Sequence, residues 1–154
     1  TSIPGTTTYD ATNRLGTNLN FGIREFGMAC CANGIAIHGG LRPFVGCFAV
    51  FSDYMKSAIR MSALSKLPVL YIFSHDSISV GEDGPTHQPI EQLAMLRSIP
   101  NVNVCRPGDA RETFACYKEA LLLTQTPSAI VTCRNNLPLL ANSSYASIIS
   151  SILL

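Results

Sequence analysis

Short apolar runs rich in β-branched and aromatic residues alternate along the chain with longer runs of helical period. The run at 69–73, VLYIF, has the strongest strand character. Further strands are predicted at 19–23, 45–51, 102–105 and 129–133. Helices are predicted at 25–38, 53–66, 90–98 and 109–123, where apolar residues recur every three to four positions.

Turn-forming and capping residues mark the ends of these elements. Gly39 and Gly40 follow the first predicted helix, and Ser52 or Asp53 is placed to cap the second. Asp109 is placed to cap the last one. In the second helix the residues at helical spacing are Tyr54, Ala58, Met61 and either Leu64 or Ser65.

Strands separated by helices of 10 to 15 residues favour a three-layer α/β/α fold with a mostly parallel sheet. In such a sheet, function lies in the loops that follow the carboxyl ends of strands. We expect one domain at 19–140, an irregular segment at 1–18, and a tail at 141–154 that reads as a truncated linker. The chain reads as a piece of something larger.

Composition narrows the class of protein. The 154 residues are 47% hydrophobic and 14% charged, which excludes disorder and leaves few charges for the surface of a free monomer. A net charge of +1 gives no field for nucleic acid, and no apolar run is long enough to span a membrane. The six scattered cysteines include no C-x-x-C motif, which favours reduced thiols in the cytoplasm over a zinc site at Cys30, Cys31 and His38.

A few polar and aromatic residues fall where the sheet should end. Glu25 opens a helix, where a carboxylate either stabilises the helix dipole or exchanges a proton with a ligand. Three aromatic residues are spaced three apart and form either core or a ring-binding slot: Phe48, Phe51 and Tyr54. His75, Asp83 and His87 share one long polar loop, and loops of this length are usually functional or disordered.

The segment NFGIREFGMA at 20–29 resembles the strand-to-helix signature of the pyrimidine-binding domain of transketolases, which use thiamine diphosphate. The resemblance continues through HDSISVGEDGPTHQP at 75–89 and PSAIVTCRNNLPLL at 127–140. It covers about residues 20–140, and the second segment is highly specific. The implied activity is transfer of a two-carbon ketol unit between ketose and aldose phosphates, as in the pentose phosphate pathway.

The resemblance also implies a role for each candidate residue. Glu25 would share a proton with the pyrimidine ring of the cofactor, which requires a raised pKa. Phe48, Phe51 and Tyr54 would line the pyrimidine pocket. The sugar would meet His75, Asp83 and His87, with Arg134 on its phosphate. Both histidines count as catalytic candidates. Arg24, Arg42, Arg106 and Arg111 are read as solvated or ion-paired surface residues.

Two departures from the family pattern limit this reading. Phe26 stands where the family usually has His, and no G-D-G…Asn pattern for Mg²⁺ (or Ca²⁺) and the diphosphate is present. We therefore expect the metal and diphosphate to be held by a domain absent from this chain, within a homodimer, and the isolated chain to be inactive. The alternatives are a deoxyxylulose-phosphate synthase, a pyruvate dehydrogenase β subunit, or a degenerate, non-catalytic interaction module.

Overall fold

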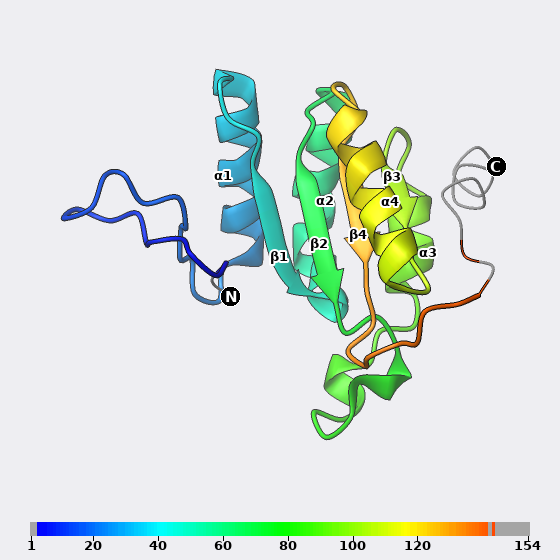
Figure 1. Cartoon of the computed structure of the whole chain (residues 1–154). Helices are drawn as coiled ribbons and strands as arrows, with labels where there is room; N and C mark the ends of the chain where they lie inside the picture. The colour runs from blue at the N-terminus through cyan, green and yellow to red at the C-terminus, as the bar shows by residue number, and fades with distance from the viewer. Residues whose placement is uncertain (1–2, 142, 144–154) are drawn as a thin grey trace.

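A parallel sheet with helices against it forms the body of the computed structural model, which describes residues 3–141 and 143 (Figure 1). The helices are α1 (Glu25–His38), α2 (Ser52–Leu64), α3 (Gln92–Arg97) and α4 (Ala110–Leu122). The strands are β1 (Phe44–Phe48), β2 (Leu70–Ser74), β3 (Asn103–Cys105) and β4 (Ser128–Val131). Short 3₁₀ turns are η1 (Ala49–Phe51), η2 (Ile78–Val80) and η3 (Pro85–His87). Most of the tail at 141–154 lies outside the described residues.

All four strands run parallel, in the order β1-β2-β4-β3. Their carboxyl ends therefore meet at a single edge of the sheet, the lower edge in Figure 1. The segments that follow β1, β2 and β4 all leave from this edge. The predicted α/β fold with a parallel sheet is confirmed.

The sheet separates two apolar cores, because successive residues of a strand point to opposite faces. Tyr71 and Phe73 of β2 pack in the larger core with buried residues of α1, α2 and α3. Leu70 of β2 and Ile130 of β4 pack on the other face with residues of α4. Helices thus cover both faces, three on one and α4 on the other.

A buried polar network joins α1 to α2 and the sheet. Asn33 of α1 donates from Nδ2 to the carbonyl oxygen of Ala58 at 2.9 Å. Ser62 of α2 donates to Asn33 Oδ1 at 2.5 Å and shares a 2.5 Å hydrogen bond with the Tyr71 hydroxyl. The three buried side chains satisfy one another, so they fix how α1 and α2 pack together.

The predicted strand at 19–23 is wrong. Gly22 has φ +66°, and the N–H of Arg24 donates to the Gly22 carbonyl oxygen at 3.1 Å, so the backbone turns there instead of extending. Residues 3–24 lie beside α1 and extend away from the sheet (Figure 1). Their one β-bridge joins Thr8 to Asn18.

The predicted stripe of α2 is wrong except at Ala58, which is buried, and the predicted caps are wrong. Tyr54, Met61 and Leu64 are exposed, whereas Met55, Ile59 and Ser62 are buried beside Ala58. The helix continues from η1 without a side-chain cap. Ser52 Oγ donates to the carbonyl oxygen of Ala49, and the Asp53 carboxylate accepts a hydrogen bond from Gln92.

The strand predicted at 45–51 ends at Phe48, and its last three residues form η1 instead; the other predicted elements are present with ends shifted by up to two residues. Helix α1 has the predicted bounds and ends at Gly39 and Gly40, both at positive φ. Asp109 caps α4 by accepting a hydrogen bond from the backbone N–H of Glu112 at 2.9 Å. No helix in the described part of the chain has the length and apolar composition needed to cross a membrane.

Candidate functional site

Three aromatic rings form a row at the carboxyl edge of the sheet. Phe48 ends β1, Phe51 ends η1, and Tyr54 lies in the first turn of α2. Adjacent ring centroids are 6.3 Å apart, and the interplanar angles are 20° between Phe48 and Phe51 and 23° between Phe51 and Tyr54. Phe48 and Phe51 are half-buried, whereas Tyr54 is 64% exposed. We call these three residues the aromatic row.

His75 lies directly on the first ring of this row. Its imidazole stacks on Phe48 with centroids 3.6 Å apart and an interplanar angle of 17°. Its backbone has φ +58°, in the left-handed region that residues other than glycine rarely adopt. A 2.9 Å hydrogen bond between its Nδ1 and Ser74 Oγ fixes the ring further. Unusual backbone of this kind is concentrated at functional sites.

His87 approaches the same rings from the other end of the long loop. Its ring meets Phe51 edge-on, with centroids 5.4 Å apart, and Phe48 at 6.5 Å. Its Nδ1 shares a 2.9 Å hydrogen bond with Thr86 Oγ1. Two histidines twelve positions apart in the sequence therefore meet the aromatic row, one on a face and one through an edge.

Glu25 begins α1 and is half-buried beside β1. Burial, together with the nearby charge of Glu25, raises the pKa of the Cys47 thiol to about 12. Since Cys47 directly precedes Phe48, the carboxylate lies near the strand end that carries the aromatic row. Phe26, the residue that departs from the family pattern, is 53% exposed.

Asp83 and Arg134 are exposed at the same edge of the sheet. Asp83 lies in a turn between Gly81 and Gly84, whose φ values are +95° and +76°. Arg134 lies just after β4. Within the described residues, Glu25, Asp83 and Arg134 make no hydrogen bond, ion pair or ring contact with the aromatic row. The structure therefore brings five of the eight predicted residues into a chain of ring contacts: Phe48, Phe51, Tyr54, His75 and His87.

Two polar contacts that anchor the long loop were not predicted. Asp76 pairs with Arg106, and Gln92 donates to the Asp53 carboxylate at 2.9 Å while accepting from the backbone N–H of Ile90 at 3.0 Å. Asp76 and Arg106 each follow a strand, so the meeting of carboxyl ends in a parallel sheet was the available signal. Gln92 gave no such signal, because its partner lies 39 positions away.

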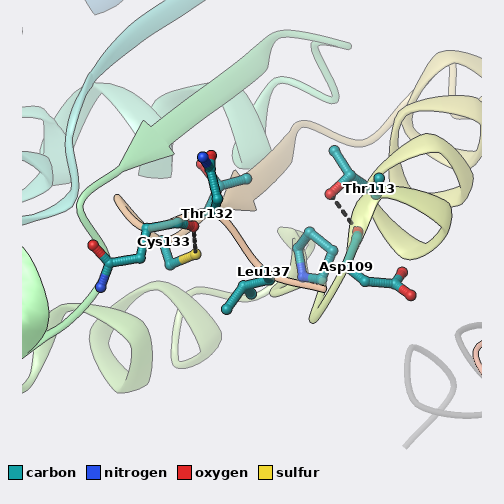
Figure 2. Close-up of a pocket in the computed structure, with 9 residues that line it drawn as sticks. Asp109, Thr113, Thr132, Cys133 and Leu137 are labelled. Atoms are coloured by element: carbon teal, nitrogen blue, oxygen red, sulfur yellow. Dashed lines mark hydrogen bonds between the residues drawn. The ribbon is translucent and has the colours of Figure 1, made fainter. Parts of the chain in front are cut away.

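A separate cavity of about 350 Å³ lies between the segment that follows β4 and the start of α4 (Figure 2). Thr132, Cys133 and Leu137 line it from that segment, and Asp109 and Thr113 line it from the start of α4. Its polar groups are largely used within the chain: Thr113 Oγ1 donates to the Asp109 carbonyl oxygen and the Cys133 thiol to that of Asn135. No sequence-predicted site residue lines the cavity.

Comparison with known proteins gives one consistent result. Residues 5–139 match the family model described as the transketolase pyrimidine-binding domain. The chain is 59% identical over 128 residues to a probable transketolase of Streptococcus pneumoniae, covering 83% of this chain and 20% of that protein. The chain thus spans about one fifth of the length of that relative.

Solved structures agree. A transketolase of Pichia stipitis in complex with sedoheptulose 7-phosphate superposes with a TM-score of 0.92 at 41% identity, covering 96% of this chain and 23% of that one. A split-gene transketolase, described as an inactive β4 tetramer, superposes with a TM-score of 0.66 at 34% identity and covers 79% and 38% of the two chains. The chain belongs to the family of transketolase pyrimidine-binding domains.

Proposed function

We propose that this chain supplies the pyrimidine-binding part of a thiamine-diphosphate transketolase that moves a two-carbon ketol unit from a ketose phosphate to an aldose phosphate. The observation that carries the proposal is the aromatic row with His75 stacked on it and Glu25 beside its strand. The relatives in the comparison, among them one solved with a sugar phosphate, support the same assignment.

The donor set fits the pyrimidine half of the cofactor. A flat heterocycle requires apolar faces for its ring and a polar partner for its nitrogen, and the aromatic row and Glu25 offer these at one sheet edge. Thiamine diphosphate supplies, when bound, the acidic thiazolium carbon that takes up the two-carbon unit. The part of this chain is to orient the pyrimidine against Phe48, Phe51 and Tyr54 and to hold a shared proton on the Glu25 carboxyl group.

The remaining candidate residues are assigned to binding of the sugar substrate. His75 and His87 present imidazole rings to the aromatic row, and each has its Nδ1 hydrogen-bonded to a neighbouring hydroxyl. Their Nε2 atoms are the ones left to meet substrate and to exchange protons with it. We assign Asp83 to orient a sugar hydroxyl and Arg134 to bind the phosphate with its planar guanidinium.

A diphosphate-binding domain with Mg²⁺ must complete the site, and the assembly we propose is a homodimer. Large apolar side chains exposed on α1 and its flanks support such a partner, including Ile23, Phe26, Ile37 and Leu41. The split-gene relative, inactive as a tetramer of its β chains, supports the expectation that this chain alone is inactive. The six free cysteines support a place in the reducing cytoplasm and its pentose phosphate pathway.

The test is a chimaera in which residues 5–139 replace the matching segment of the Streptococcus pneumoniae relative. We expect thiamine-dependent ketol transfer from a ketose phosphate. Glu25→Gln should lower kcat by about 10²–10⁴-fold, as for a positioned proton-transfer group. Glu91→Gln, at the start of α3, is the matched control and should change kcat less than about twofold.

A properly folded chimaera that binds the cofactor yet transfers no ketol unit would contradict the proposal and favour a non-catalytic module. Normal turnover by Glu25→Gln would remove Glu25 from its role while leaving the family assignment intact.

A further inference from the structure

The ion pair between Asp76 and Arg106 ties the long loop to the end of β3. Arg106 donates from Nε to Asp76 Oδ2 at 2.7 Å, and its Nη2 lies 2.6 Å from the same oxygen. The Asp76 side chain is 2% exposed, whereas that of Arg106 is 45% exposed. The carboxylate is thus held from the solvent side by a guanidinium that closes over it.

The other carboxylate oxygen is costly to the fold. Asp76 Oδ1 is buried and has no hydrogen-bond partner among the residues that the structure describes. A buried acceptor without a donor destabilises a protein, so the pair is a poor device for stability alone. Such groups require another explanation, and their position along the chain suggests one.

Asp76 directly follows His75, whose backbone is left-handed at φ +58°. On the other side, Ser74 is held by the sheet, since it ends β2 and is in register with Phe48. The sheet therefore fixes the residue before the turn and the ion pair fixes the residue after it. A side chain other than glycine keeps this conformation only where its surroundings hold it in place.

The consequence of this turn is the position of one ring. It brings the His75 imidazole back over β1, where the ring stacks on Phe48 at 3.6 Å. Without an anchor at Asp76, the backbone could relax to an extended conformation and carry the imidazole off the aromatic row.

We propose that Asp76 and Arg106 are positioning residues for His75: their ion pair holds the left-handed turn that stacks the imidazole on Phe48. The link to catalysis rests on the proposed function, because His75 is there assigned to the sugar. The effect of the ion pair on the position of the His75 ring does not rest on the proposed function, because it concerns only the structure of this chain.

The geometric test is NMR on the 154-residue chain, whose three histidines, His38, His75 and His87, are assigned by single substitution to Gln. A ring stacked on Phe48 has upfield-shifted imidazole protons, and Phe48→Leu defines the loss of that shift. Arg106→Gln should abolish the upfield shift of His75 and leave His38 and His87 in place. Arg106→Lys should restore it in part, and Arg60→Gln, an exposed change on α2, should have no effect.

Two results would overturn the proposal: a His75 shift unchanged in Arg106→Gln, or equal movement of His75 and His87, which would mean that the whole loop had collapsed.

In the chimaera, Arg106→Gln should lower kcat/KM for the ketose phosphate about 10-fold or more, with cofactor affinity within about twofold. If the unmodified chimaera is inactive, the proposed function fails while the NMR result still decides the positioning. If the ring moves and an active chimaera keeps its kcat/KM, His75 loses its sugar role and the positioning stands.

Discussion

The guanidinium of Arg42 donates from Nη1 to the carbonyl oxygen of Leu121 at 2.5 Å, and so ties the segment before β1 to the last turn of α4. Its Nη2 also donates to the carbonyl oxygens of Ala120 and, at 2.6 Å, Leu123. These are carbonyl groups that a helix leaves unpaired at its end, and a cation there is favourable to the helix dipole. Arg42 is therefore a helix cap and not the solvated or ion-paired residue that the sequence suggested.

Replacing this cap should destabilise the chain. We expect Arg42→Gln to lower the free energy of unfolding by about 1–3 kcal/mol, because hydrogen bonds from a charged donor are lost at three carbonyl groups. Urea unfolding followed by circular dichroism measures it. Arg97→Gln, in the last turn of α3, is the control. A loss below about 0.5 kcal/mol for Arg42→Gln would show that water replaces the guanidinium without cost.

The Tyr71 hydroxyl should matter through the network that it closes. It shares a hydrogen bond with Ser62 Oγ in a fully buried place, and burial raises the pKa of Tyr71 to about 12. Tyr71→Phe should lower the free energy of unfolding by about 1–2 kcal/mol, since Ser62 loses a partner without access to water. Tyr117→Phe removes a hydroxyl that makes no hydrogen bond to any residue the structure describes, and should cost less than about 0.5 kcal/mol. Equal losses in the two variants would mean that the network adds nothing specific.

Asp109 should make the chain sensitive to acid. Hydrogen bonds from the Glu112 backbone, the Ser143 hydroxyl and the Leu140 backbone lower the pKa of Asp109 from its ordinary 3.8 to about 2. Because the pKa of Asp109 is lower in the folded chain than in the unfolded one, its ionised carboxylate stabilises the fold at any pH above the unfolded pKa of 3.8. That contribution is lost as the pH falls from about 4 toward 2.

Urea midpoints measured across this range should therefore fall less steeply in Asp109→Asn than in the unmodified chain. Asp83→Asn, an exposed change, should keep the original slope. Identical pH profiles for Asp109→Asn and the unmodified chain would mean that the hydrogen bonds do not favour the ionised form.

Arg134 should discriminate between sugars. In the active chimaera, Arg134→Ala should raise KM for phosphorylated sugars by about 10- to 100-fold and leave unphosphorylated analogues nearly unchanged, because only the former lose a charged contact. Steady-state kinetics with matched donor pairs measures this, and Arg97→Ala serves as the control. An equal rise for both kinds of sugar would remove Arg134 from the phosphate site.

Local signals predicted much of the fold. The pair Gly39 and Gly40 ended α1 at the right residue, and Asp109 caps α4 as its position indicated. The failure at 19–23 comes from a local turn at Gly22, whereas the failure in α2 comes from contacts between distant parts of the chain. Ser62 is polar and still buried, because Asn33 and Tyr71 supply its hydrogen bonds, so the apolar pattern of α2 alone does not identify the buried stripe.

In the candidate site, too, local groupings could be predicted from the sequence and contacts between distant residues could not. Phe48, Phe51 and Tyr54 could be grouped from their spacing, because a strand end and the following helix keep neighbours together. The stacking of His75 on Phe48 could not be predicted, since it depends on a left-handed backbone at a residue that rarely adopts one. The partner of Asp76 lies 30 positions away, and the parallel sheet indicates only that the two strand ends meet at one edge, not that these two side chains form a pair.

The uneven covering of the sheet has a consequence for how the chain opens. Helix α4 alone closes its face over a small cluster that includes Leu70, Cys116 and Ile130, whereas three helices bury the other face. Sub-global unfolding begins where the fewest apolar contacts resist it. Amide protons of α4 should thus exchange with deuterium before those of α2. The hydrogen bonds from Arg42 to the end of α4 should set how often this helix detaches from the sheet.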